Sequence, residues 1–414
     1  MHAALSPLPV ELPPPKGKPL ALLAGVRVLD LTTSIAGPYA AMLLGDFGAD
    51  VVKVESIDGG DDARAWGPPF LEGESLWFLS VNRNKRGVAL DLASEAGLQA
   101  LHDLIDVADV LIINRPAAVA ARLGIDYGAA SARNPRLVYA SITGFGLDGE
   151  RADHACYDLI AEGHSGVMDL TGAKDGAPQK VGVPAADMLA GQDAALAALA
   201  ALLARHKSGA GSLIDISLLE SMTRFLTCRV VPYLGSGEMP TRSGGTDSVI
   251  AIYRTFETAD RPITLGLGNN SIWRRFCEAI NRTDLVVDTR FQTNADRRAH
   301  REWLVEQIAE VIRHRPQAHW LAAFRTARVP AGPINTVADV SADLPLRERG
   351  LFFAIAEEER VIPQVGLGIH FDGEPAAPRF APPALGAHSR EVLGDWLNYD
   401  QSALDALFSK PPTG

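Results

Sequence analysis

The chain has 414 residues and a net charge of −11, with 47% apolar and 21% charged residues. This length exceeds the usual size of one hydrophobic core, so we expect two domains in a globular protein. The negative charge argues against nucleic acid or an anionic membrane surface as the main partner.

The start of the chain and the cysteines indicate the compartment. Residues 1–20 are rich in proline and lack the basic and apolar segments of a signal peptide, so we interpret them as an arm. The cysteines Cys156, Cys228 and Cys277 are odd in number and irregular in spacing, which indicates a reducing environment without a disulfide framework. No apolar run reaches the roughly 18 residues of a membrane span. We therefore expect a cytoplasmic protein.

Strand and helix patterns alternate from residue 21 to residue 229. Apolar runs predict strands over residues 26–31, 51–55, 109–114, 136–142 and 211–217. Helices are predicted over residues 38–47, 94–105, 127–133 and 218–227, with a short one after Pro116. This alternation predicts an α/β fold with a Rossmann-like parallel sheet covered on both faces. Ligands of such sheets bind beyond the carboxyl ends of the strands, so the loops at those ends should face one site.

The pattern changes after residue 229. Residues 230–335 predict linkers and a smaller α+β domain, with strands at 249–256 and 263–267 and helices at 271–280, 295–313 and 316–326. Residues 336–414 are expected to return to the first, large domain, which spans residues 21–229.

A long apolar helix is predicted after Asp187. Its apolar run, residues 194–204, ends in Arg205, His206 and Lys207, and Gly209 follows as a stop signal. Because it is apolar on all sides, we expect it to be buried. The partial positive charge of its amino end should hold the Asp187 carboxylate ionised, as a nucleophile requires. A plain capping role for Asp187, which would satisfy unpaired backbone N–H groups, is the alternative.

Other motifs are less specific. Residues 144–149 match the G-x-G-x-x-G pattern of dinucleotide sites, but the polar residues after them do not predict the helix that this site needs. The basic stretch 82–86 suits either a phosphate contact or a solvated turn between strands. The histidines and cysteines lack the spacings of metal ligands, so we predict no metal site.

In order along the chain, these motifs resemble the class III CoA transferases, the family of formyl-CoA transferase and carnitine CoA-transferase. The resemblance covers about residues 25–397 and rests on the segments 28–31 with 36–38, 45–55, 82–91, 134–136 and 172–178, together with the turn at Asp187. It implies that Asp187 is catalytic. In this family the carboxylate attacks an acyl-CoA thioester, giving an anhydride and then an aspartyl-CoA thioester that passes CoA to an acceptor acid.

The resemblance also implies a set of binding residues and an assembly. The expected contacts to CoA are Ile35, Ala36, Leu90, Asn114, Arg115, Arg122, Tyr157 and Asp158. Gly244 and Gly245 resemble a glycine-rich flap over the acyl site. The family further implies an interlocked homodimer and no tightly bound cofactor, with the CoA thioester and a small carboxylic acid as substrates.

Alternatives remain at this point. Within the family, an α-methylacyl-CoA racemase would need a second proton-transfer group, and Tyr157 stands where the racemases have histidine. From other classes, a nicotinamide-dependent dehydrogenase built on residues 144–149 or a CoA-binding protein without activity would also fit parts of the pattern.

Overall fold

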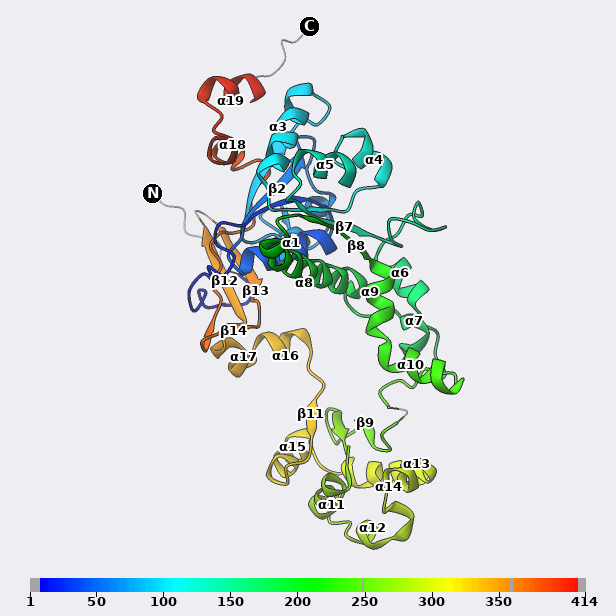
Figure 1. The fold of residues 1–414 in the computed structure, drawn as a ribbon. Helices are drawn as coiled ribbons and strands as arrows, with labels where there is room; N and C mark the ends of the chain where they lie inside the picture. Colours follow the sequence, from blue (N-terminus) through cyan, green and yellow to red (C-terminus); the bar gives the residue numbers. More distant parts are fainter. Residues whose placement is uncertain (1–7, 248, 358–359, 409–414) are drawn as a thin grey trace. The chain divides into compact units, whose positions relative to one another are not determined.

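The computed structural model of the chain describes residues 8–247, 249–357 and 360–408 (Figure 1). Residues 1–7 of the predicted arm and 409–414 of the predicted C-terminal segment lie outside it. The described residues form two compact units. Unit 1 comprises the described parts of Met1–Val167, Lys180–Gly235 and Asp343–Gly414, and unit 2 comprises Met168–Gln179 and the described part of Ser236–Ala342.

Unit 1 is built on a six-stranded parallel sheet with the order β5-β2-β1-β6-β7-β8. Its strands are β1 (Arg27–Leu31), β2 (Asp50–Ser56), β5 (Lys85–Leu90), β6 (Val110–Ile113), β7 (Val138–Thr143) and β8 (Ser212–Ser217). The predicted α/β fold with a parallel sheet is confirmed. The chain builds outward from β1 to β2 and β5, and then returns to the other side of β1 with β6. The strand order therefore reverses at β1.

Helices cover both faces of this sheet. Along β1, Leu29 and Leu31 point to one face, where they join a core with α3 (Glu95–Val107), α5 (Tyr127–Arg133) and α18 (Ser389–Leu397). The helices α1 (Ala36–Asp46) and α8 (Ala185–Ser208) lie side by side on the other face (Figure 1). The side chains of β1 alternate between the faces, so Asp30 lies on the α1 face.

The helix α8 has the predicted end signals. Its last turn holds Arg205, His206 and Lys207, and Gly209 ends it in the left-handed conformation at φ 73°. The prediction of complete burial is wrong, because Leu196 is 63% and Leu203 69% exposed. By length and hydropathy α8 would also pass as a membrane span, contrary to the expectation from the sequence. A core helix passes that test too, and α8 packs along α1 in unit 1.

Unit 1 contains further, shorter helices. They are α2 (Leu76–Ser80), α4 (Ala117–Arg122), α6 (Asp158–Ser165), α9 (Leu218–Phe225), α10 (Thr227–Ser236), α17 (Leu344–Glu348) and α19 (Gln401–Phe408), with a 3-10 turn at Asp62–Ala65; α7 (Val167–Leu170) begins at the junction with unit 2. The hairpin of β12 (Phe352–Glu357) and β13 (Arg360–Val365), the pair β14 (His370–Phe371) and β15 (Glu374–Pro375), and the pair β3 (Phe70–Leu71) and β4 (Glu74–Ser75) complete it.

The described part of the arm lies against the C-terminal segment. Ala354 N donates to the carbonyl oxygen of Pro13 at 2.9 Å, and Lys18 pairs with Ala376 in a parallel bridge. The Lys16 ammonium donates to the carbonyl oxygen of Glu348 at 2.9 Å. The described part of the arm therefore packs against the β12–β15 region.

The basic stretch 82–86 differs from both predictions made for it. It enters β5, a strand that the sequence did not predict, and its side chains from Asn82 to Arg86 are all buried. Arg83 forms a bidentate ion pair with Asp46, in which Nε donates to Oδ1 at 2.9 Å and Nη2 donates to Oδ2 at 2.6 Å. The stretch is therefore neither a solvated turn nor an exposed phosphate contact.

Unit 2 contains an antiparallel sheet in the order β11-β10-β9, formed by β11 (Ala331–Pro333), β10 (Ile263–Gly266) and β9 (Tyr253–Phe256). Its helices are α11 (Asn270–Ala279), α12 (Asp284–Val287), α13 (Asn294–Ala299), α14 (Arg301–Ile312), α15 (Gln317–Thr326) and α16 (Val337–Ser341), with a 3-10 turn at Thr289–Phe291. Its core is rich in aromatic side chains, including Trp273, Phe276 and Phe324. The predicted strands and helices of this region are thus present with shifted bounds, but residues 230–236, at the start of the region predicted as linkers and small domain, belong to α10.

Candidate active site

The loop after β1 and the residues after β6 meet where the strand order reverses. We name residues 32–35 the β1–α1 loop. Thr33 N donates to Asn114 Oδ1 at 3.1 Å, and Asn114 Nδ2 donates to the Thr33 carbonyl oxygen at 2.8 Å. Ile35 and Ala36 are buried at the start of α1, and Arg115 follows Asn114 in a half-buried position. The reversal point of a parallel sheet is where such folds bind ligands, so these predicted residues share a suitable place.

Asp187 lies in the first turn of α8. One turn further along, Gly191 touches α1 so closely that a Cβ there would lie 2.4 Å from the carbonyl oxygen of Ala36. Only glycine permits this approach without a shift of either helix. The contact connects the amino-terminal part of α8 to Ala36, the first residue of α1 after the β1–α1 loop, and it brings Asp187 toward the carboxyl edge of the sheet.

Another carboxylate caps α8. Asp158, the first residue of α6, accepts hydrogen bonds at Oδ1 from Ala186 N at 2.8 Å and from Asp187 N at 3.2 Å. These amides are among those that a helix leaves unpaired at its amino end. The capping role considered for Asp187 therefore belongs to Asp158. Asp187 is inside the helix, and its side chain is not needed to satisfy the backbone.

The surroundings of Asp187 raise its pKa. Burial, followed by the negative charge of Asp158, raises the pKa of Asp187 from 3.8 to about 7. Both causes act against the ionised form. The expectation that the helix end holds this carboxylate ionised is therefore too simple. A carboxyl group with a pKa near neutrality is more basic than an ordinary aspartate, and it can gain or lose a proton at working pH.

Two nearby residues were missed by the sequence analysis. Glu162 is fully buried on α6, four positions after Asp158, and accepts a hydrogen bond at Oε2 from Val181 N at 2.8 Å. Its Oε1 has no hydrogen-bond partner among the described residues, and burial raises its pKa. Burial and the charge of Asp187 raise the pKa of the Cys156 thiol. The helical spacing of Asp158 and Glu162 was the signal that could have placed both carboxyls on one face.

The other predicted positions of unit 1 differ in element and exposure. Leu90 is buried at the end of β5, Arg122 is exposed as the last residue of α4, and Tyr157 precedes α6 with 70% of its surface exposed. Residues 144–149 form turns after β7, and the next helix begins at Asp158. The helix that a dinucleotide fingerprint requires does not follow this pattern.

In unit 2, two glycine-rich segments predicted separately lie together. A Cβ on Gly244 would lie 3.6 Å from the Cα of Ala173. Arg242 donates to the carbonyl oxygen of Asp169 and forms an ion pair with its carboxylate at 3.3 Å. Gly245 accepts a hydrogen bond from Thr255 N at 3.1 Å. The proposed flap is therefore supported by the loop of residues 169–176 and by β9.

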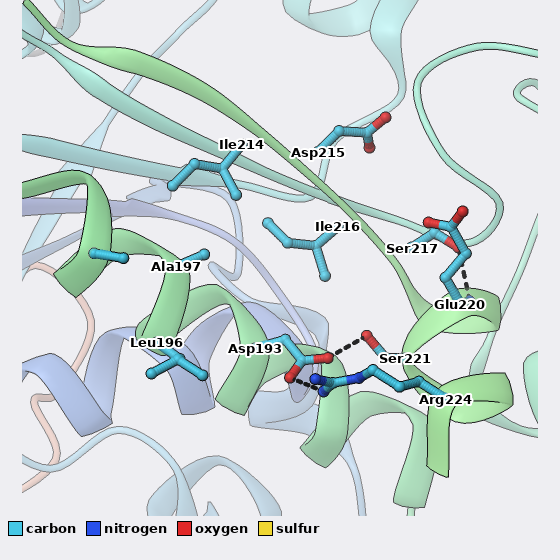
Figure 2. Close-up of a pocket in the computed structure, with 11 residues that line it drawn as sticks. Asp193, Leu196, Ala197, Ile214, Asp215, Ile216, Ser217, Glu220, Ser221 and Arg224 are labelled. Carbon is cyan, nitrogen blue, oxygen red and sulfur yellow. Dashed lines mark hydrogen bonds and ion pairs between the residues drawn. The ribbon is translucent and has the colours of Figure 1, made fainter. Parts of the chain in front are cut away.

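A hollow of about 390 Å³ lies between α8, β8 and α9 (Figure 2). Its apolar side includes Leu196 and Ile216, and Asp193 bonds to Ser221 at 2.8 Å and to Arg224 at its rim. None of the predicted site residues lines it. It joins the exposed apolar stripe of α8 rather than the surroundings of Asp187.

Comparisons with known proteins agree on one family. The model of CoA-transferase family III matches residues 23–389. The chain is 39% identical to the succinate–glutarate CoA-transferase of Agrobacterium fabrum, over 92% of this chain and 97% of that protein. It is 36% identical to the succinyl-CoA:glutarate CoA-transferase of Mus musculus, over 93% and 88%. A solved CAIB/BAIF family protein from Brucella suis is 36% identical with a TM-score of 0.81, covering 90% and 99% of the two chains.

Proposed function

The chain belongs to CoA-transferase family III and is a CoA-transferase, and from this premise we propose that Asp187 carries the acyl group and then CoA between donor and acceptor. The observation that carries the proposal is the state of this side chain. Its carboxyl group is released from capping by Asp158, and its pKa is raised to about 7. It is the kind of basic, poorly hydrated carboxylate that covalent catalysis needs.

The reaction has two halves. In the first, an ionised oxygen of Asp187 attacks the thioester carbonyl carbon, the C–S bond breaks, and an acyl anhydride and the CoA thiolate form. The thiolate then attacks the aspartyl carbonyl, which releases the donor acid and leaves an aspartyl-CoA thioester. In the second half, the acceptor carboxylate displaces the thiolate to form a new anhydride. The thiolate attacks the acceptor's carbonyl, giving the new acyl-CoA and free Asp187.

The β1–α1 loop and its neighbours are proposed to hold CoA. The positions are those expected from the family resemblance, namely Ile35, Ala36, Leu90, Asn114, Arg115, Arg122, Tyr157 and Asp158. Asn114 is engaged with Thr33, and its bonds fix the loop against β6. Asp158 has the second task of capping α8. We assign Gly244 and Gly245 of unit 2 to the flap over the acyl group.

The substrates are proposed to be a short dicarboxylic acid and its CoA thioester. The relatives at 39% and 36% identity are named for succinate or succinyl-CoA with glutarate. We therefore assign succinyl-CoA as donor and glutarate as acceptor. CoA enters as a substrate, and no tightly bound cofactor is part of the proposal.

The assembly is proposed to be a homodimer in the cytoplasm. The exposed apolar side chains of α8 and α9, namely Leu196, Leu203 and Phe225, are 63%, 69% and 60% exposed. Side chains of this size gain most by burial against another surface. A second copy of the chain is the occupant that the family resemblance implies, and a molar mass in solution of one chain would contradict it.

The test is a transfer assay on the purified chain. With succinyl-CoA and glutarate, we expect glutaryl-CoA and free succinate in equal amounts, and hydroxylamine should trap an adduct on Asp187 alone. Incubation of a 2-methylacyl-CoA in D₂O tests the racemase alternative. Deuterium uptake at the α-carbon without transfer would overturn the proposal, because racemization needs proton exchange and transfer does not.

A further inference from the structure

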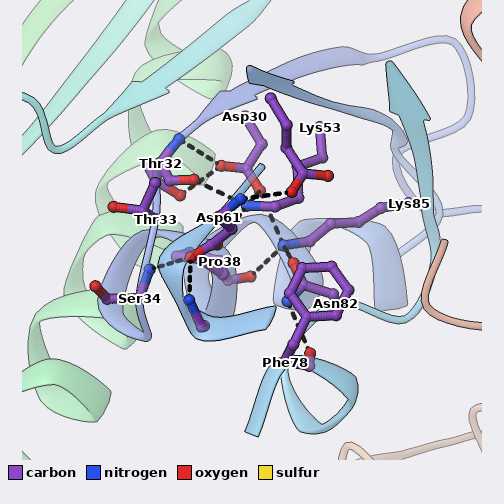
Figure 3. A network of polar contacts seen from close by, with 12 residues as sticks. Asp30, Thr32, Thr33, Ser34, Pro38, Lys53, Asp61, Phe78, Asn82 and Lys85 are labelled. Atoms are coloured by element: carbon purple, nitrogen blue, oxygen red, sulfur yellow. Dashed lines mark hydrogen bonds and ion pairs between the residues drawn. The ribbon is translucent and has the colours of Figure 1, made fainter. Parts of the chain in front are cut away.

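Four charged side chains are buried beneath the β1–α1 loop. We name Asp30, Lys53, Asp61 and Lys85 the charged cluster; none is more than 1% exposed. Asp30 of β1 stands opposite Lys53 of β2 in the parallel register, and Asp61 follows β2. Figure 3 shows their side chains converging under the loop. With two cations and two anions, the charged cluster is neutral as a whole.

Ion pairs connect the charged cluster internally. Lys53 Nζ lies 2.9 Å from Asp61 Oδ2 and 4.0 Å from Asp30 Oδ2, and Lys85 Nζ lies 2.9 Å from Asp30 Oδ2. Burial alone would raise the pKa of Asp30, but the charges of Lys85 and Lys53 outweigh it and lower the pKa to about 2. The two cations therefore keep this buried carboxylate ionised.

The charged cluster also bonds to the backbone of the loop. Lys53 Nζ donates to the Thr32 carbonyl oxygen at 2.8 Å, and Asp30 Oδ1 accepts from Thr32 N at 3.0 Å and Thr32 Oγ1 at 2.5 Å. Asp61 Oδ1 accepts from Ser34 N at 2.9 Å. Ser34 has a φ of 71°, in the left-handed region that serine seldom occupies. Its conformation therefore needs the support that Asp61 supplies.

Lys85 holds the first turn of α1. Its ammonium donates to the Pro38 carbonyl oxygen, to Asn82 Oδ1 and to Asp30, at 2.8, 2.8 and 2.9 Å. Asn82 in turn donates to the Phe78 carbonyl oxygen at 2.8 Å. Every proton of the Lys85 ammonium therefore has an acceptor, as a buried ammonium requires.

A chain of close contacts leads from the loop to α8. A Cβ on Gly37 would lie 2.3 Å from the side chain of Thr32, so the start of α1 lies directly on the loop. Gly191 of α8 then packs on the carbonyl of Ala36. Asp187 is one helical turn before Gly191. A displacement of the loop would thus reach the turn that carries Asp187.

We propose that the charged cluster is a positioning device for the reaction. It fixes the β1–α1 loop and the first turn of α1, and through Gly191 it fixes the first turn of α8 that presents Asp187. The inference rests on the proposed role of Asp187 in transfer. Its members are positioning residues, because the structure places them beneath the loop rather than in contact with a reacting atom.

The test compares two buried cations of the same segment. Lys85→Met removes the bonds to Pro38 and Asp30, whereas the control Arg83→Met unpairs Asp46 at the opposite end of α1. Below the unfolding temperature of each variant, we expect Lys85→Met to lower kcat at least tenfold and Arg83→Met to leave it within twofold. Amide hydrogen exchange should accelerate in residues 32–38 and 185–191 in Lys85→Met alone.

Further variants test the positioning role if Lys85→Met does not fold. In Asp30→Asn with Lys85→Met the charges balance again, so a merely structural role predicts recovered kcat, while positioning predicts a persistent loss because Pro38 has no donor. Thr32→Val removes one hydroxyl at almost constant volume and should lower kcat by about threefold, the direction expected for one lost buried hydrogen bond. Gly191→Ala pushes α8 away from Ala36 and should lower kcat as well.

The outcomes separate this inference from the proposed function. An inactive wild type would end the transfer proposal, and the hydrogen exchange would still decide whether the charged cluster orders the two segments. Unchanged kcat and unchanged exchange in Lys85→Met, or in Thr32→Val if the lysine variants do not fold, would overturn the positioning role.

Discussion

The charged cluster and the carboxylates around Asp187 lie on the same face of one sheet, yet they treat charge in opposite ways. In the charged cluster each ion has an opposite partner within 2.9 Å, and Asp30 keeps a pKa of about 2 although it is fully buried. Around Asp187 the nearest charge is Asp158, and the pKa is about 7 although the residue is less buried. Burial alone therefore does not decide the state of a carboxylate; its charged neighbours do.

This difference separates two tasks. Balanced and hydrogen-bonded charges hold the backbone in one arrangement and are unreactive. An unbalanced carboxylate costs stability but remains basic, which suits a nucleophile. In the part of the chain that the structure describes, we find no lysine or arginine in an ion pair with Asp158 or Asp187. Substitutions that remove these charged groups one at a time test the difference between the two sites.

The largest effect is expected from removal of Asp187, the proposed nucleophile. Asp187→Ala should lower kcat by at least about a thousandfold, because the proposed anhydride and thioester both form on this carboxylate, whereas Asp193, the other carboxylate of α8, is engaged by Ser221 and Arg224. The capping bonds to Asp158 use the backbone, so the variant should fold and still bind acyl-CoA. Steady-state transfer assays measure the loss of kcat, and titration calorimetry measures the binding of acyl-CoA. Turnover near the wild-type rate would remove Asp187 from the mechanism.

Removing one partner of the buried Arg83–Asp46 ion pair should lower the free energy of unfolding. Arg83→Met leaves the Asp46 carboxylate buried without its cation, and we expect a loss of roughly 3 kcal/mol in the free energy of unfolding. Urea denaturation measures it. Replacing both partners, with Asp46→Leu added, should recover most of the loss, since no buried charge then remains. If the double variant were as unstable as the single one, lost packing rather than unpaired charge would be the cause.

The sequence was sufficient to predict five of the six strands of the parallel sheet, the end signals of α8 and the family. Apolar runs such as residues 26–31 and the end signals of α8 act locally, so they can be recognised without tertiary contacts. The strand β5 was missed because its first residues, Lys85 and Arg86, are charged. Their partners Asp30 and Asp50 are distant in sequence. A lysine or aspartate inside a strand predicted to be buried was the available sign that such a partner exists.

The site was predicted only in part for a similar reason. Asp187 and Asp158 were both selected, but their relation depends on α6 meeting the amino end of α8, which no spacing in the sequence reveals. The sequence therefore left open whether Asp187 was a cap, and it did not reveal that burial and the charge of Asp158 raise the pKa of Asp187. Residues 172–178 and Gly244 were likewise identified separately, and the fold of unit 2 brings Gly244 next to Ala173.

A smaller effect, on stability, is expected from neutralising Asp187, the proposed nucleophile. The pKa of Asp187 is raised from 3.8 to about 7, so its ionisation lowers the free energy of unfolding. This cost is complete above pH 7, decreases between pH 7 and pH 3.8, and is absent below pH 3.8. Asp187→Asn should therefore raise the free energy of unfolding by about 2 kcal/mol at pH 8, reduced from the full shift because the residue is partly exposed. The gain should shrink toward pH 4. Urea denaturation at both pH values checks it, and an equal change at both would exclude ionisation as the cause.

The smallest effect tests the carboxylate that creates the imbalance. Asp158→Asn keeps an acceptor oxygen for the amides of Ala186 and Asp187 but removes the negative charge that raises the pKa of Asp187. The acidic limb of kcat/KM, which reports ionisation in the free enzyme, should move to lower pH by up to about one unit. The control Glu220→Gln, on α9 in the rim of the hollow, should leave the limb in place.

The direction of this shift distinguishes two roles for Asp158. If it tunes the nucleophile, the variant is active at lower pH and slower at its optimum, because a less basic carboxylate is a weaker nucleophile. If it serves only as the cap of α8, asparagine should replace it with neither change. An unmoved limb would mean that burial alone sets the pKa of Asp187. The contrast with Asp30 would then rest on the lysines of the charged cluster and not on the like charge beside the nucleophile.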